Sequence, residues 1–182
     1  TGETYTLRET VAPDGYAVTS DTTFALDAAG KIDASKTTTS VSTAGVLLVK
    51  DALTSVSISK VDIANGKELA GATIQVLDST GKVVDSWTST TTAHEITGLK
   101  TGETYTLRET VAPDGYAVTS DTTFALDAAG KIDASKTTTS VSTAGVLLVK
   151  DALTSVSISK VDIANGEELA GATIQVLDST GK

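Results

Sequence analysis

The chain repeats itself: residues 1–82 and 101–182 have the same sequence, except that Lys67 becomes Glu167, so the period is 100 residues. Solenoid and propeller repeats have periods of roughly 20–50 residues, because each unit is only a supersecondary piece, whereas about 100 residues is the usual size of a self-sufficient domain. The repeat therefore predicts a tandem array of whole domains. Nearly identical copies of a domain favour a structural role over catalysis.

Composition and alternation indicate the fold class. Thr, Ser and Val are abundant, aromatic residues make up 4% of the chain, and Pro13 and Pro113 are the two prolines. Stretches such as 104–107 (Thr-Tyr-Thr-Leu) alternate with the period of a half-buried strand. We therefore expect an all-β fold, an Ig-like β-sandwich repeated along a rod-like array.

Charge and cysteine content exclude several classes of function. The net charge of −9 argues against nucleic acid or an anionic membrane as a partner, because phosphate binding relies on clustered Lys and Arg. The chain has no cysteine, so any covalent staple in these small domains must be something other than a disulfide. No stretch approaches the roughly 20 apolar residues of a membrane helix, and no signal peptide or anchor is recognisable. We expect a window from a longer protein.

Turn signals set the phase of the repeat. Strands are expected at 53–62, 72–77, 83–87, 104–111, 122–126 and 146–149, with turns such as Asn65-Gly66 between them. One complete domain then spans 53–152, while 1–52 is the C-terminal half of a preceding repeat and 153–182 is the N-terminal half of a following one. Neither half should fold alone, because its core face lacks a partner sheet. The junction 150–154 has no Gly or Pro, which predicts a stiff connection.

Three ionisable residues continue the apolar side of a strand. Lys60 shares parity with Val56 and Ile58, Glu109 with Tyr105 and Leu107, and Asp151 with Leu147 and Val149. Each of them would reach water if its strand ended there. The last strand is also ambiguous, since Val146, Leu148 and Lys150 alternate equally well.

If the three side chains meet in the core, burial predicts a reaction. Burial lowers the pKa of an amine and raises that of a carboxyl, by as much as about 3–5 units for enclosed groups. A neutral amine held beside a protonated carboxyl gains an effective molarity on the order of 10⁵ M or more. Glu109 would move the proton between them. The product would be an amide between Lys60 and Asp151, with one water lost.

The same residues carry a family resemblance. Residues 59–62 (Ser-Lys-Val-Asp), 67–72 (Lys-Glu-Leu-Ala-Gly-Ala) and 102–116, with its Tyr-x-Leu-x-Glu-x-x-Ala-Pro-x-Gly-Tyr pattern, resemble the CnaB-type (SpaA-like, prealbumin-like) domain of Gram-positive surface adhesins and pilins. The run 149–152 (Val-Lys-Asp-Ala) is similar to the closing strand of a fibronectin-binding adhesin of that family. The resemblance spans essentially the whole complete repeat.

The resemblance implies an autocatalytic isopeptide bond. It assigns the first-strand lysine to Lys60, the catalytic glutamate to Glu109 and the acceptor to Asp151. Many relatives use Asn as the acceptor, but Asn65 and Asn165 are the only asparagines and both lie in the early turn. The partial repeats carry half-sites, Glu9 and Asp51 at the start and Lys160 at the end, which should stay unreacted unless separate chains complement one another.

We therefore expect a stalk segment of an extracellular, cell-wall-anchored surface protein whose partners are the neighbouring repeats. The alternative is a module that binds host matrix or glycan by multivalent repetition, through threonine triplets such as 90–92 and 137–139. A glycan site, however, usually has an aromatic platform, and these triplets have none.

A conventional enzyme is the least favoured class. His94 is the single histidine, no catalytic triad can be assembled around it, and a loop position is expected for it. Asp62, Asn65 and Glu68 do not have the spacing of a calcium loop, so an ordinary turn is the better interpretation and no metal or cofactor is expected. Trp87 is expected to pack against the sheet or core.

Overall fold

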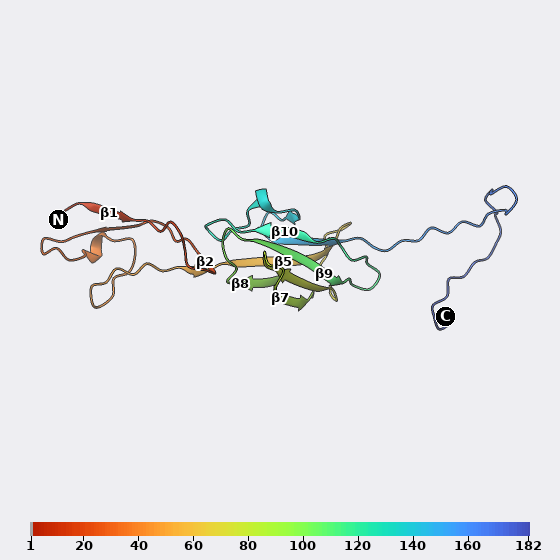
Figure 1. The fold of residues 1–182 in the computed structure, drawn as a ribbon, viewed down its shortest axis with the longest axis horizontal. Helices are drawn as coiled ribbons and strands as arrows, with labels where there is room; N and C mark the ends of the chain where they lie inside the picture. The colour runs from red at the N-terminus through yellow and green to blue at the C-terminus, as the bar shows by residue number, and fades with distance from the viewer. Residues whose placement is uncertain (1) are drawn as a thin grey trace.

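The computed structural model describes residues 2–182, and within them the regular structure is strands and two short 3₁₀ helices, η1 (Ala34–Lys36) and η2 (Ala134–Lys136). The all-β prediction is confirmed. Figure 1 shows an elongated molecule with a β-sandwich in its middle, an open N-terminal segment at one end and an extended C-terminal segment at the other.

The sandwich consists of two four-stranded sheets. The first sheet has the order β10 (Thr122–Ala125), β9 (Thr104–Val111), β6 (Thr73–Leu77) and β7 (Val83–Thr88), all antiparallel. The second has the order β11 (Ser140–Val141), β12 (Leu147–Asp151), β5 (Ser55–Asp62) and β8 (His94–Thr97). In the second sheet β12 and β5 run parallel, while the other pairs are antiparallel.

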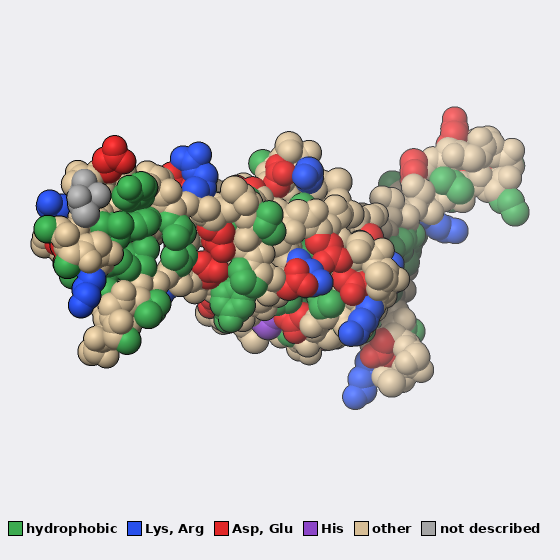
Figure 2. All heavy atoms as spheres, turned by 60° about the vertical axis from the view of Figure 1, so that its left-hand side comes forward, with side chains coloured by type: hydrophobic (Ala, Val, Ile, Leu, Met, Phe, Trp, Pro, Cys, Tyr) green, Lys and Arg blue, Asp and Glu red, His purple; other side chains and the backbone are tan. Residues whose placement is uncertain are grey.

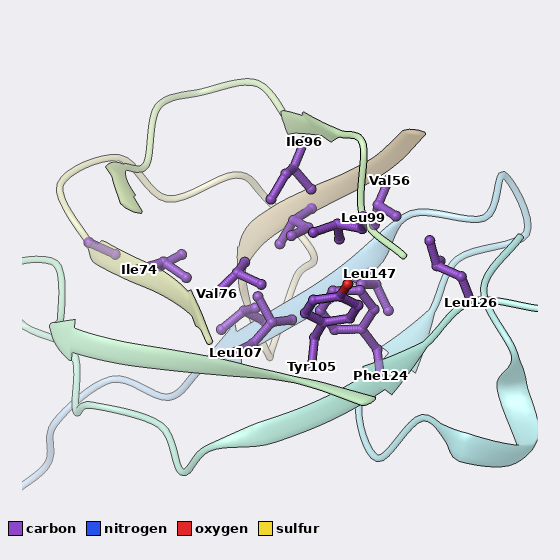
Figure 3. Close-up of a cluster of buried hydrophobic side chains, with 13 residues drawn as sticks. Val56, Ile74, Val76, Ile96, Leu99, Tyr105, Leu107, Phe124, Leu126 and Leu147 are labelled. Carbon is purple, nitrogen blue, oxygen red and sulfur yellow. The ribbon is translucent and has the colours of Figure 1, made fainter. Parts of the chain in front are cut away.

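The core fills the space between the two sheets (Figure 3). Its members are the inward residues of the alternating strands, together with loop residues that close the ends, and all of them lie between Val56 and Val149. Ile74, Val76 and Leu147 are fully enclosed, each with 0% exposure. Burying such side chains is the main favourable term in folding, at roughly 1.5–3 kcal/mol each.

The parallel pairing of β12 with β5 decides the parity of the last strand. Val149 lies opposite Lys60 and Asp151 opposite Asp62 in this register. Leu147, Val149 and Asp151 are buried, whereas Lys150 is only half-buried. The alternative alternation, with Lys150 on the inner side, is therefore not the one that the fold adopts.

The strand β8 was not anticipated, and the loop position expected for His94 is wrong. His94 begins β8 and pairs with Ile58 of β5. Its ring stacks on Trp87 with 4.1 Å between ring centroids, and its Nε2 lies 2.7 Å from Asp85 Oδ2. The strand has four residues at a sheet edge with Ile96 as its one buried residue, so its sequence carries little alternation.

The two partial repeats differ from the sandwich although they share its sequence. In the N-terminal segment β1 (Thr4–Leu7) pairs with β3 (Thr22–Ala25), and β2 (Tyr16–Ala17) pairs with β4 (Ala52–Leu53). Figure 2 shows hydrophobic side chains gathered on this segment. Residues 153–182, all described, contain no strand.

A matched pair of residues shows why the C-terminal segment forms no sheet. Ile74 is 0% exposed in the sandwich and its copy Ile174 is 54% exposed in the C-terminal segment. Since the local sequence is the same, the difference comes from the sheets that surround Ile74. Strands of this length need such a partner face to be stable.

Candidate functional site

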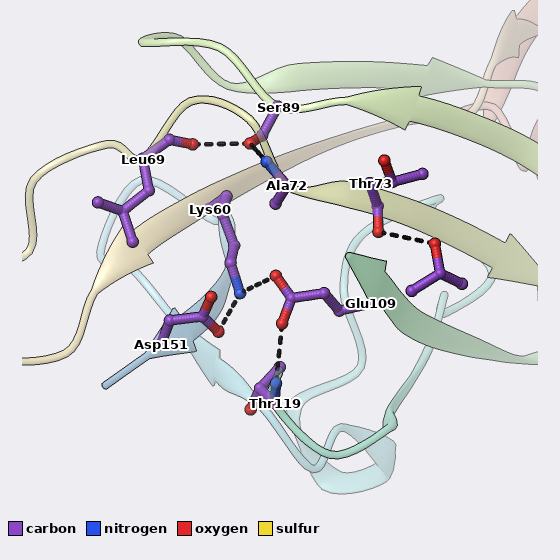
Figure 4. Close-up of polar contacts among 9 residues, drawn as sticks. Lys60, Leu69, Ala72, Thr73, Ser89, Glu109, Thr119 and Asp151 are labelled. Carbon is purple, nitrogen blue, oxygen red and sulfur yellow. Dashed lines mark hydrogen bonds and ion pairs between the residues drawn. The ribbon is translucent and has the colours of Figure 1, made fainter. Parts of the chain in front are cut away.

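Lys60, Glu109 and Asp151 converge in the sandwich from three strands, β5, β9 and β12 (Figure 4). Lys60 Nζ lies 2.8 Å from Glu109 Oε1, as a close ion pair without the geometry of a hydrogen bond. The same amine donates a short hydrogen bond to Asp151 Oδ1. One amine thus contacts both carboxyl groups at once.

The site is sealed from solvent. The side chains of Lys60, Glu109 and Asp151 are all 0% exposed. None of the three curls out to water at a strand end, which was the alternative open from sequence. A charged group at such depth is costly unless it is paired, so the three groups depend on one another.

Glu109 is held in place by a backbone contact that sequence reasoning missed. Its Oε2 accepts a hydrogen bond of 2.8 Å from the backbone N–H of Thr119. The same bond, also 2.8 Å, joins Glu9 and the N–H of Thr19 in the N-terminal segment. The loop that follows the glutamate, which carries this N–H, therefore positions the glutamate without help from the lysine. No side-chain pattern marks this interaction, because the donor is the main chain.

Burial sets the electrostatics of Asp151. Desolvation raises the pKa of its carboxyl, and the hydrogen bond and charge of Lys60 act in the opposite direction. Its Oδ2 is buried and accepts no hydrogen bond from the described residues. A carboxyl in this environment is biased toward the neutral acid.

A further buried carboxyl, that of Asp62, lies beside the site. Asp62, opposite Asp151 in the sheet, accepts a 2.8 Å hydrogen bond from the Tyr116 hydroxyl, and this bond lowers the pKa of Asp62. The N–H of Ile63 also donates to the backbone oxygen of Asp151, at 2.9 Å. These contacts tie the 112–118 loop and the two parallel strands together around Lys60. Tyr116 was part of the family pattern but had no predicted role.

The half-sites of the partial repeats are incomplete, as their sequence position requires. Glu9 lies near Asp51, whose pKa is raised by burial and then by the charge of Glu9. Asp51 Oδ1 is buried and without a hydrogen-bond partner in the described residues. Lys160 is exposed on the extended C-terminal segment. The structure does not bring Lys160 and Asp51 together.

Other candidate residues have structural surroundings. Trp87 packs against the hydrophobic core. Residues 2–182 hold no group of three or more His, Cys, Asp or Glu side chains able to bind a metal, and no helix long and apolar enough to cross a membrane.

Most hydroxyls of the threonine triplets take part in hydrogen bonds within the protein. The Thr137 and Thr139 hydroxyls donate to the backbone oxygens of Asp133 and Leu148, and the Thr138 hydroxyl accepts from the N–H of Thr123. In the other triplet Thr90 and Thr92 contact each other. These groups serve the loops in which they lie.

The complete repeat is a two-sheet β-sandwich whose first and last strands, β5 and β12, lie side by side. A lysine is buried in it between two carboxyls. Residues 54–140 match the SpaA family, described as "Prealbumin-like fold domain". This match, which covers just under half of the chain, confirms the resemblance noted from the sequence.

Solved structures give further similarities. The chain is 34% identical to the pilus-presented adhesin Cpa over 43% of its length and 17% of the adhesin chain, with a TM-score of 0.37. It is 17% identical to the shaft pilin SpaA from Lactobacillus rhamnosus GG, covering 85% of this chain and 66% of the pilin, with a TM-score of 0.45. The Bacillus anthracis TIE protein is 24% identical, covering 90% and 28%, with a TM-score of 0.46. No curated protein matches the sequence.

Proposed function

We propose that this chain is a stalk segment of a Gram-positive surface adhesin or pilus-like fibre, whose complete repeat is stabilised by an autocatalytic amide bond between Lys60 and Asp151. The observation that carries the proposal is the sealed contact of one amine with two carboxyls. The match of residues 54–140 to the SpaA family supports the pilin or adhesin class.

The reaction needs only the three side chains. With Asp151 protonated, the Lys60 ammonium gives a proton to the Glu109 carboxylate, leaving a neutral amine beside a neutral acid. The amine nitrogen attacks the Asp151 carboxyl carbon, Glu109 gives its proton to the departing hydroxyl, and the resulting Glu109 carboxylate accepts the proton that the nitrogen loses. The C–O bond breaks, the C–N bond remains, and one water leaves.

Closing the bond would replace buried charges by a neutral amide. The ion pair must otherwise be held against the desolvation cost of both charges. The bond would close a loop of 91 residues, which by analogy with a disulfide stabilises the domain by roughly 4–5 kcal/mol. That is comparable with the total stability of a small domain, and the chain has no cysteine for any other covalent link.

The location follows from the same proposal. A covalently locked domain suits an extracellular protein that bears load, and we place the chain in a surface protein held at the cell wall. The chain spans about a sixth of the pilus-presented adhesin that it matches. The anchor and the ligand-binding part are accordingly assigned to other regions of the protein.

Intact mass spectrometry of the purified 182-residue chain tests the bond. We expect a mass one water below the sequence mass, and the full sequence mass in a Glu109→Ala variant, because the proton carrier is gone. A full sequence mass in the unaltered chain would overturn the proposal.

The repeat supplies a matched control. Glu9→Ala removes the same residue from the incomplete half-site, and this variant should still lose one water. Peptide mapping of the unaltered chain should then recover Lys60 and Asp151 in one cross-linked peptide.

A further inference from the structure

The N-terminal segment and the sandwich meet at a close contact in which Thr54 is central. The Thr54 hydroxyl donates to the backbone oxygen of Leu99 at 2.6 Å, and its N–H donates to the oxygen of Gly15 at 3.0 Å. Thr54 therefore makes hydrogen bonds both to the turn of the preceding repeat, at Gly15, and to a loop of its own repeat, at Leu99. Two strands, β2 and β4, lead into this point (Figure 1).

Further polar contacts cross the boundary. The N–H of Val18 donates to the oxygen of Ala128 at 2.9 Å, and Lys100 Nζ lies 2.7 Å from Asp14 Oδ2. The second is an exposed pair, which contributes little energy by itself but restricts orientation. The contacts reach the sandwich at two separate loops, so they oppose both bending and twisting.

Identical sequence elsewhere in the chain separates the effect of docking from that of local structure. Thr54, Gly15 and Gly130 are buried, and their copies one repeat away, Thr154, Gly115 and Gly30, are exposed. Gly15 meets only residues of the next repeat, so its burial arises from the contact between the two repeats. Thr54 and Gly130 are buried partly by that contact and partly by their own repeat.

Two glycines make this approach possible. A Cβ on Gly15 would lie 2.8 Å from the backbone oxygen of Gly98. A Cβ on Gly130 would lie 3.0 Å from Ala17 Cβ and 3.1 Å from a methyl carbon of Thr54. The same Cβ atoms on Gly115 and Gly30 would meet nothing within 4 Å.

We propose that these surfaces form a docking site between consecutive repeats: the Pro-Asp-Gly-Tyr turn of one repeat binds the 98–100 and 128–130 loops of the next and holds the pair in one orientation. The following junction already presents the first half of the site. There the N–H of Thr154 donates to Gly115 at 2.9 Å, and Tyr116 bridges to Leu153, as Tyr16 pairs with Leu53. The turn at 113–116 is thus built to receive the next complete repeat.

Distance distributions between two spin labels test the site in the full 182-residue chain. Because the chain has no cysteine, labels at Lys36→Cys and Thr91→Cys report only the orientation of the N-terminal segment on the sandwich. We expect a narrow distribution by double electron–electron resonance. A broad distribution in the unaltered chain would overturn the proposal.

The decisive comparison is Gly130→Ala against Gly30→Ala. Both glycines have positive φ, +72° and +74°, so the strain that alanine introduces into the turn is matched. Only Gly130→Ala places a methyl group in the joint, and it should broaden or shift the distribution while Gly30→Ala leaves it narrow. Equal distributions in the two variants would contradict the docking role.

A second pair of variants tests the docking site independently, in case Gly130→Ala impairs folding. Gly15→Ala and Gly115→Ala also share their φ, +83° and +82°, and only the first should disturb the joint. Thermal unfolding of each variant checks that the sandwich is intact. The joint does not depend on the amide bond, so a narrow distribution together with an unchanged mass would reject the proposed cross-link and retain the docking site.

Discussion

At Lys60 one positive charge faces two carboxyls in a site closed to water. If all three groups were ionised, the pocket would hold a net negative charge that nothing nearby neutralises, which is costly at low dielectric. A protonated Asp151, in line with its raised pKa, leaves the Lys60 and Glu109 charges balanced. In that protonation state a carboxylic acid is in contact with the Lys60 ammonium, and transfer of one proton from the ammonium to Glu109 gives the neutral amine that amide formation requires.

The acceptor can be tested by changing its leaving group. In Asp151→Asn the amine would displace ammonia instead of water, and the amide formed would be the same. We expect the cross-linked product to have the same intact mass as the cross-linked unaltered chain, one ammonia below the variant's own sequence mass. An uncross-linked mass for Asp151→Asn would show that the site requires an acid as acceptor.

Among the elements, the parallel pair β5 and β12 carries the site, and the loop before β10 clamps its end. The Tyr116 hydroxyl reaches Asp62 at the last residue of β5, next to Asp151 in the register. The loop that orients Glu109 through Thr119 therefore also holds the strand that carries Lys60. Positioning of the three groups is distributed over both sheets.

This clamp predicts a pH dependence. The pKa of Asp62 is lowered in the folded state, so its contribution to stability is present above the unfolded pKa of about 3.9 and is lost as the pH falls through the lower folded value. Tyr116→Phe should lower the melting temperature at neutral pH and flatten its fall in acid. Thermal unfolding between neutral pH and strongly acidic pH measures both effects.

Tyr16→Phe is the matched control, because Tyr16 lies on the partial sheet and is 38% exposed. It should leave the fall of the melting temperature in acid unchanged. If Tyr116→Phe also left that fall unchanged, the Asp62 contact would not contribute to the pH dependence.

At the scale of the whole molecule, the proposed amide bond would hold each repeat together under tension, and the proposed docking site would hold neighbouring repeats in line. Force that enters at β5 would pass through the amide to β12 and leave at the next junction, so the strands between would bear none of it. The joint would keep successive repeats aligned. The reach of the array would then grow with the number of copies.

Single-molecule stretching checks this path of force. Without the bond, unfolding should release the 91 residues between Lys60 and Asp151, which at roughly 3.5 Å each is on the order of 300 Å. We expect that step in Glu109→Ala and its absence in the unaltered chain. A step of similar length in both would mean that the strands, not a covalent bond, carry the load.

The amino-acid sequence alone determined the features that depend on near neighbours: the repeat, the all-β class, the turns, most strand positions and the identity of the three ionisable residues on the apolar sides of their strands. The tertiary structure decided what depends on distant residues. The direction of Asp151 followed from pairing with a strand about 90 residues away, as the parallel register fixes its parity. The edge strand β8 and the Thr119 contact had no side-chain pattern. The clearest case is sequence that occurs twice: Ile74 and Ile174 differ in burial because one copy has partner sheets and the other does not.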